Sequence, residues 1–137
     1  MPYEIRREPS GGVHKRFWGH VTGEELIASS LDLHASPGFE SLRYSINDYL
    51  AVETYHVQEM DVRLVSGFTI DASHANARIL IAIVTRDPQV RALVEPFRRR
   101  IQPSHPVGIF PSLEEARHWV RVQQSQLKPI PVPELRA

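Results

Sequence analysis

The stretch Ile79-Leu80-Ile81-Ala82-Ile83-Val84 decides the fold of this 137-residue chain. Its six apolar residues, most of them β-branched, have the length and composition of a β-strand. Successive side chains of a strand point to opposite faces of the sheet, so a run that is apolar throughout requires cover on both faces. Such strands are typical of the middle of a parallel sheet. We therefore expect 79–84 at the centre of a mostly parallel sheet, with helices on its faces.

The residues before this strand predict a strand and then a helix. Leu42, Tyr44 and Ile46 alternate with polar residues, which indicates a half-buried strand. From Val57 the apolar spacing changes to three and four residues, which indicates a helix that ends at Asn76-Ala77. The predicted buried face of this helix consists of Val57, Met60, Leu64, Val65 and Phe68.

The residues after the strand repeat the alternation of helix and strand. Asp87-Pro88 is an N-cap followed by proline at the first helical position, which predicts a helix start. Pro96 lies inside this helix, and we expect it to kink or split the helix. Val107–Phe110 has the length of a short buried strand. Ser112-Leu113-Glu114-Glu115 is a capping box, which predicts the start of a last helix.

The N-terminal residues predict a hairpin that leads into a helix. Tyr3–Arg7 and Val13–Trp18 both alternate, and the turn sequence Pro-Ser-Gly-Gly lies between them. Thr22 and Glu25 form a second capping box, so a helix follows, and the proline–glycine pair at 37–38 stops it.

The elements therefore follow one another in the order ββαβαβαβα. This order predicts an α/β fold with a mixed, mostly parallel sheet, an N-terminal hairpin and helices packed on the sheet. Residues 1–126 are expected to form a single domain, and 127–137 to form a Pro-rich extended tail.

Composition excludes several classes of protein. The chain has no cysteine, which excludes a disulfide scaffold, a thiolate zinc site and a cysteine nucleophile. Sixteen basic and sixteen acidic residues balance, so we expect no nucleic-acid partner. No run approaches the roughly 20 apolar residues of a membrane span, and the first residues lack the apolar core of a signal peptide. We therefore expect a cytoplasmic protein.

The motifs that accompany metal binding and catalysis are missing from the sequence. Seven histidines are scattered without metal-ligand spacing, and no nucleophile elbow, phosphate-binding loop or dinucleotide fingerprint is present. We expect no metal, no cofactor and no catalytic residues, so the chain is predicted not to be an enzyme. Arg98-Arg99-Arg100 is the one basic run, and it predicts at most weak peripheral contact with a membrane.

The best candidate for a functional surface is the stretch 48–56, which has no regular period and is expected to be a loop. It follows the carboxyl end of a predicted strand, the edge at which ligand sites of open α/β sheets gather. The predicted ligand- or partner-binding residues are Asp48, Tyr49, Thr54, Tyr55, His56 and, from the end of the next strand, Arg86. Three alternatives stay open: a rigid loop, an enzyme pocket built on Asp48, His56 and Arg86, and a purely structural assembly protein.

The order of elements and several short sequences resemble the SpoIIAA-like family, distant relatives of anti-sigma-factor antagonists in the STAS superfamily. The resemblance covers about residues 3–122. It is carried by Gly19-His20-Val21-Thr22, Asn47-Asp48, Asn76-Ala77-Arg78-Ile79 before Ile81-Ala82-Ile83-Val84, and the closing segment Val107-Gly108-Ile109-Phe110-Pro111-Ser112-Leu113-Glu114-Glu115-Ala116-Arg117-His118-Trp119-Val120.

The resemblance implies a non-enzymatic cytoplasmic binding module that either regulates a protein partner or carries a small apolar ligand. Antagonists of the STAS superfamily are phosphorylated on Ser or Thr at the start of the helix after the third strand. The matching stretch here is 48–56, in which Thr54 is the one hydroxyl apart from the tyrosines, and the usual Asp-Ser signature is missing. A homodimer is left open.

Overall fold

The structure is a computed structural model that describes residues 2–102 and 105–126. The predicted Pro-rich tail lies outside the described residues. The chain forms a five-stranded sheet in the order β1-β2-β3-β4-β5, in which β1 is antiparallel to β2 and the other neighbours are parallel. The strands are β1 (Tyr3–Arg7), β2 (Gly12–Thr22), β3 (Tyr44–His56), β4 (Leu80–Val84) and β5 (Val107–Phe110). The predicted mixed, mostly parallel α/β fold is confirmed.

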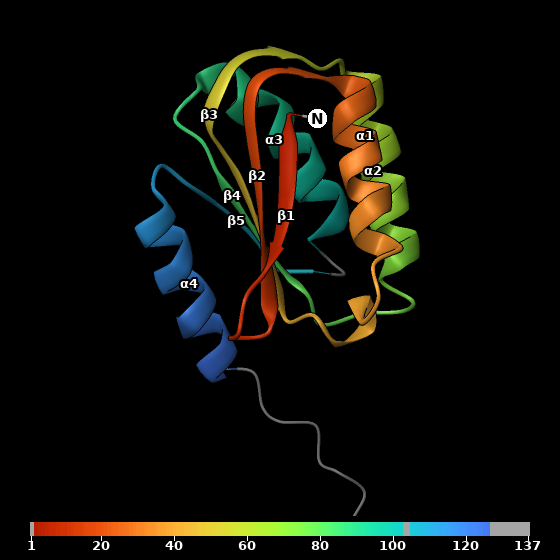
Figure 1. The fold of residues 1–137 in the computed structure, drawn as a ribbon, viewed down its shortest axis with the longest axis vertical. Coiled ribbons are helices and arrows are strands. Elements are labelled where there is room, and N and C mark those ends of the chain that lie inside the picture. Colours follow the sequence, from red (N-terminus) through yellow and green to blue (C-terminus); the bar gives the residue numbers. More distant parts are fainter. Residues whose placement is uncertain (1, 103–104, 127–137) are drawn as a thin grey trace, which may run out of the picture.

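Helices cover both faces of the sheet, but unequally. Figure 1 shows α1 (Gly23–His34), α2 (Glu59–Ala72) and α3 (Pro88–Ile101) on one face and α4 (Leu113–Gln126) on the other. A short 3₁₀ helix, Phe39–Ser41, lies between α1 and β3. Each parallel strand is added beside the preceding one in the same direction, and crossovers between parallel strands are right-handed. The three crossover helices must therefore lie on one face, and the other face is covered by α4, which is not part of a crossover.

Strand β4 contributes to a core on each side of the sheet. Ile81 and Ile83 pack in the larger core beneath α1–α3, whereas Leu80, Ala82 and Val84 pack in the smaller core beneath α4. All five side chains are at most 7 % exposed, so the predicted two-sided burial is confirmed. The predicted position of 79–84 at the centre of the sheet is wrong, because β3 is the middle strand and β4 (Leu80–Val84) lies between it and the edge strand β5.

The hairpin and the helix caps form as predicted. The pairing of β1 with β2 runs from Tyr3↔Phe17 to Arg7↔Val13. The Thr22 hydroxyl accepts a hydrogen bond from the Glu25 N–H at 3.3 Å, and the Glu25 carboxylate accepts one from the Thr22 N–H at 3.0 Å. The capping box therefore predicts the start of the first helix correctly.

The predicted buried face of α2 is correct at Val65 but wrong at Met60 and Leu64, which are 61 % and 45 % exposed. The helix begins at Glu59 rather than Val57 and ends at Ala72 rather than at Asn76-Ala77. The buried side chains are Val62, Val65, Ser66 and Thr69. The Ser66 and Thr69 hydroxyls donate to carbonyls one turn earlier, both at 2.8 Å, and this satisfies them inside an apolar interface.

Pro96 does not split α3, which runs as one helix from Pro88 to Ile101. Val94 and Phe97 flank the proline in sequence, and both are buried in the core under the helix. Burial on either side of Pro96 holds both halves of the helix against the sheet, which offsets the loss of one backbone hydrogen bond.

Helix α4 is tied to the hairpin by an ion pair. Arg117 donates from both terminal nitrogens to the two carboxylate oxygens of Glu8, at 2.9 and 2.7 Å, and the Tyr44 hydroxyl donates to Glu8 at 2.6 Å. The Arg117 hydrogen bonds lower the pKa of Glu8 to about 2. A bidentate pair of this kind fixes α4 on the face that the crossover helices leave open.

We predict that Ile81→Asp unfolds the protein. The side chain is 7 % exposed in the larger core, and a carboxylate there loses its hydration among mostly apolar neighbours. The cost of about 4 kcal/mol or more is comparable with the whole stability of a small domain. Circular dichroism and thermal unfolding measure it. The matched control is Leu64→Asp on the exposed side of α2, and an unchanged melting temperature for Ile81→Asp would refute the prediction.

We predict that Glu8→Gln lowers the free energy of unfolding at pH 7 by about 1–2 kcal/mol. The Glu8 carboxyl has a pKa near 4.5 when unfolded and about 2 when folded. Its contribution is complete above pH 5 and is lost as the pH falls towards 2, so the difference between wild type and variant shrinks over that range. Urea unfolding at several pH values tests this. Glu4→Gln, on the exposed Glu4–Arg6 pair, is the control.

Candidate binding site at the carboxyl end of the sheet

The stretch 48–56 is a strand and not the predicted loop. It is the second half of β3, and β2 pairs with it as far as Thr22↔His56. The register shifts twice, between Arg16 and Trp18 and between Gly19 and His20, and each time β3 contributes one extra residue. Bulges interrupt the alternation of side chains. The two bulges therefore explain why the sequence of 48–56 has no regular period, which had indicated a loop.

The second half of β3 has a free edge. Strand β4 pairs with β3 only from Tyr44 to Asp48, so 49–56 has no strand on that side among the described residues. Figure 1 shows β2 and β3 continuing past the ends of β4 and β5. A hollow of about 240 Å³ lies beside this edge, and it is lined by Tyr49, Leu50, Val52, Thr85, Arg86 and Asp87.

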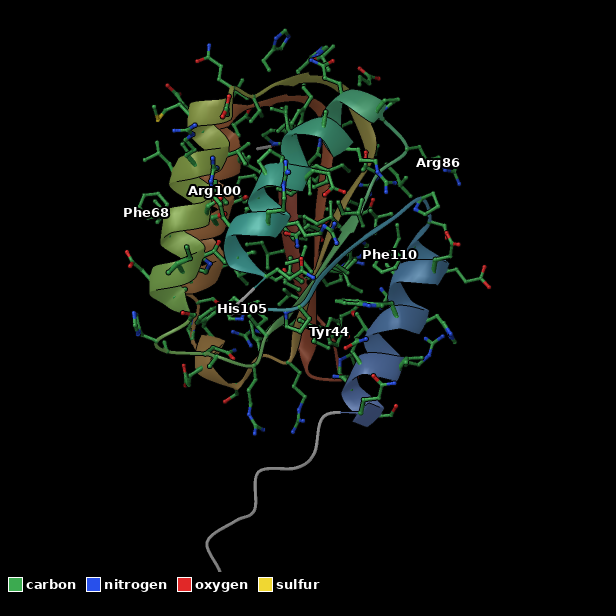
Figure 2. The ribbon with its side chains drawn as sticks, turned by 180° about the vertical axis from the view of Figure 1, so that it is seen from behind. Tyr44, Phe68, Arg86, Arg100, His105 and Phe110 are labelled. Carbon is green, nitrogen blue, oxygen red and sulfur yellow. The ribbon has the colours of Figure 1, made fainter. Side chains whose placement is uncertain are left out.

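Three of the predicted residues, Thr54, His56 and Arg86, lie at this edge or close to it, and among the described residues no side-chain hydrogen bond or ion pair joins them. Arg86 is exposed, and its Nε donates to the Pro111 carbonyl at 2.9 Å. Figure 2 shows Arg86 on the outside of the molecule, at the opposite end of the sheet from Tyr44. Thr54 hydrogen-bonds to His20 across the β2–β3 pair. His56 is the exposed last residue of β3.

Asp48 belongs to a different face and pairs with a histidine that the sequence did not single out. His14 Nε2 lies 2.9 Å from Asp48 Oδ2, and the Leu50 N–H donates to Asp48 Oδ1 at 3.0 Å. Burial alone raises the pKa of Asp48, but the hydrogen bonds from His14 and Leu50 outweigh it, and the net shift is downward. Within the described residues, Asp48 makes no hydrogen bond or ion pair with His56 or Arg86, so the proposed catalytic trio is not assembled.

Tyr49 and Tyr55 point into the core beneath α1–α3. The Tyr49 ring stacks on Phe17 with centroids 4.7 Å apart, and it meets Tyr55 edge-on at 5.8 Å. Burial raises the pKa of both hydroxyls. The six predicted residues therefore divide between the free edge, the His14 pair and the core, and Tyr49 alone among them lines both the edge hollow and an internal cavity.

Sequence reasoning missed this internal cavity. Its volume is about 70 Å³, it is partly open, and it lies between α1–α3 and the sheet. Its walls are mostly apolar, but Lys15, Ser45 and Asn47 also line it. One signal was available in the sequence. Lys15 stands between Val13 and Phe17 in an alternating strand, and a charged residue at an inward position of such a strand is unusual.

Lys15 is a buried amine. Its side chain is 3 % exposed, and Nζ donates to the Ser29 hydroxyl at 3.1 Å. Among the described residues no carboxylate lies within 4.0 Å of Nζ. Burial lowers the pKa of Lys15 to about 7, and the more distant charge of Asp32 opposes this shift.

The described residues contain no group of three or more His, Cys, Asp or Glu side chains that could hold a metal ion. None of the helices among them is both long enough and apolar enough to cross a membrane.

We predict that Lys15→Met raises the free energy of unfolding at pH 7 by about 3 kcal/mol, because it removes the cost of burying an amine. The unfolded amine has a pKa near 10.5 and the folded one about 7. Wild-type stability therefore rises as the pH increases from 7 to 10.5, and the advantage of the variant falls towards zero. Urea unfolding between pH 6 and 10 checks this, with Arg16→Met as control. A difference that does not change with pH would contradict it.

Comparisons with known proteins add one finding about the fold. No protein-family model and no curated protein sequence matches this chain. Among solved structures, the anti-sigma factor antagonist SpoIIAA in its unphosphorylated form superposes with a TM-score of 0.60 and 15 % sequence identity. The match covers 87 % of this chain and 97 % of the other. The chain therefore has the fold of SpoIIAA, as the resemblance in its sequence predicted.

Proposed function

We propose that this protein is a non-catalytic regulatory module that binds a protein partner, and that the partner adds an extended segment to the free edge of β3. The observation that carries the proposal is the unpaired half of β3, residues 49–56, with a hollow beside it. A free edge offers backbone donors and acceptors to a further strand, and this is a common mode of peptide recognition.

The side chains at this edge favour docking. Leu50 is 42 % exposed beside the hollow, and Val52 lines it. The β1 edge is different, because Glu4, Arg6 and Arg7 are exposed there and charged side chains discourage strand pairing. Strand β5 offers only four residues.

The chemistry of the hollow defines the partner segment. The partner segment needs an apolar side chain that covers Leu50, because removal of an exposed leucine from water stabilises the complex. It needs an acidic residue near Arg86, whose terminal nitrogens are free of ion pairs among the described residues. The segment is therefore extended, apolar and acidic at one end.

Two further points support a regulatory role rather than catalysis. SpoIIAA, which shares the fold, is described as an antagonist of an anti-sigma factor, so a protein of this fold acts on another protein. The residues around the hollow do not include a hydrogen-bonded nucleophile and base within the described part of the chain.

The test begins with a photo-crosslinking residue at position 50, in cells of the source organism, and the same residue at Glu114 on α4 as control. The protein captured specifically from position 50 is then purified, and its affinity is measured by calorimetry. We expect Leu50→Asp to weaken binding at least about tenfold and Arg86→Glu to weaken it as well. Leu31→Asp is the matched control, because Leu31 is 44 % exposed on α1.

Hydrogen exchange locates the contact. Amides of 49–56 that face away from β2 are expected to exchange faster than those of 80–84 in the free chain and to slow when the partner is bound. Equal binding by wild type and Leu50→Asp would refute the proposal. Capture of a second copy of this chain from position 50 would also refute it, in favour of self-assembly.

A further inference from the structure

The internal cavity has an unusual combination of walls. Apolar side chains from α1, α2, α3 and β4 form most of it, among them Leu33, Val65, Phe97 and Ile81. Lys15 from β2 brings an amine into this apolar surrounding. An isolated buried charge is costly, and buried charges are ordinarily paired.

A second polar group in the cavity makes no hydrogen bond. Ser45 is 2 % exposed, and its hydroxyl makes no hydrogen bond within the described structure. A buried hydroxyl without a partner is uncommon and costs free energy. The register places it on the same face of the sheet as Lys15 and diagonal to it, since Val13 pairs with Ser45 and Lys15 pairs with Asn47 on the adjacent strand. An unneutralised amine and an unsatisfied donor therefore line one apolar cavity.

We propose that this cavity binds a small carboxylic acid. The ligand's carboxylate pairs with the Lys15 amine and accepts a hydrogen bond from the Ser45 hydroxyl, while its short apolar tail packs against Leu33, Ile81 and Phe97. This site is independent of partner binding at the β3 edge.

The charge and the size of the cavity define the ligand class. One amine neutralises a monoanion, whereas a phosphate dianion would be left with excess charge among apolar walls. A neutral ligand would leave the protonated amine without a counter-ion. An apolar cavity of about 150 Å³ holds benzene, so about 70 Å³ encloses roughly three non-hydrogen atoms. The cavity is partly open, so a short-chain acid such as butyrate or isovalerate fits with the end of its chain in the opening.

The test is calorimetry on the purified chain with acetate, butyrate, isovalerate and octanoate, each beside its neutral amide. We expect butyrate and isovalerate to bind, with their amides at least about tenfold weaker. Lys15→Met should lose at least tenfold in affinity for the acids, and Ser45→Ala should lose a few-fold. Lys15→Met is expected to fold because methionine is apolar and of similar length, and circular dichroism of the variant checks this. Arg16→Met, which removes the exposed cation next in sequence, should bind like wild type.

A spectroscopic readout assigns the contact to Lys15. The chain contains two lysines, Lys15 and Lys128, so selective ¹³Cε labelling of lysine gives two resonances. The resonance that is absent from the spectrum of Lys15→Met belongs to Lys15. A bound carboxylate favours the charged amine, so the acid should raise the pKa of Lys15 and the amide should not. The other charged or titratable groups around the amine and its cavity are Asp32 and His34 from α1, Tyr49 and Tyr55 from β3, and His105 beside His34.

Three results would overturn the proposal. They are equal affinities for acids and amides, undiminished binding of the acids by Lys15→Met, and no binding of any acid at millimolar concentration. None of these results concerns the partner at the β3 edge, so the two proposals fail separately.

Discussion

The structure depends on the handedness of its crossovers. The strands lie in the sheet in their order along the chain, and right-handed connections then place α1, α2 and α3 on the same face. The other face would be bare if the chain ended at β5, although Leu80, Ala82 and Val84 of β4 point to it. Helix α4 covers this face, and the bidentate pair between Arg117 and Glu8 anchors the helix to the hairpin.

One helix cannot cover a five-stranded sheet. Helix α4 packs over β4, β5 and the start of β3, where Ala116 and Val120 meet Tyr44 and Ile46. The remaining part of this face, on β1 and β2, is polar, and Glu4, Arg6, His14 and Arg16 line a shallow hollow there. The His14–Asp48 pair lies at this polar part, which explains why a carboxylate on the middle strand is stable. The positions of the apolar cores and of the polar patch therefore depend on which parts of the sheet a helix covers.

The fold was predictable because its signals are local and strong. The apolar run 79–84, the cap at Thr22 and the proline at the start of α3 each point to one structure. The site was less predictable, because bulges in β3 removed the alternation that marks a strand, and no single-sequence rule detects a bulge. The face of α2 was misread because hydroxyls that bond to their own helix can be buried as readily as apolar groups. Pairing of Asp48 with His14 depends on strands 34 residues apart in sequence.

The agreement between chain order and sheet order also governs how the protein is assembled on the ribosome. Every strand that emerges can join the edge of the strand made just before it, so the sheet grows in one direction without insertion of a late strand between earlier ones. The face that carries Tyr44, Ile46 and Leu80 receives its cover last, because α4 is the final described element. A nascent chain that stops before residue 113 therefore exposes the apolar side chains of the smaller core to water.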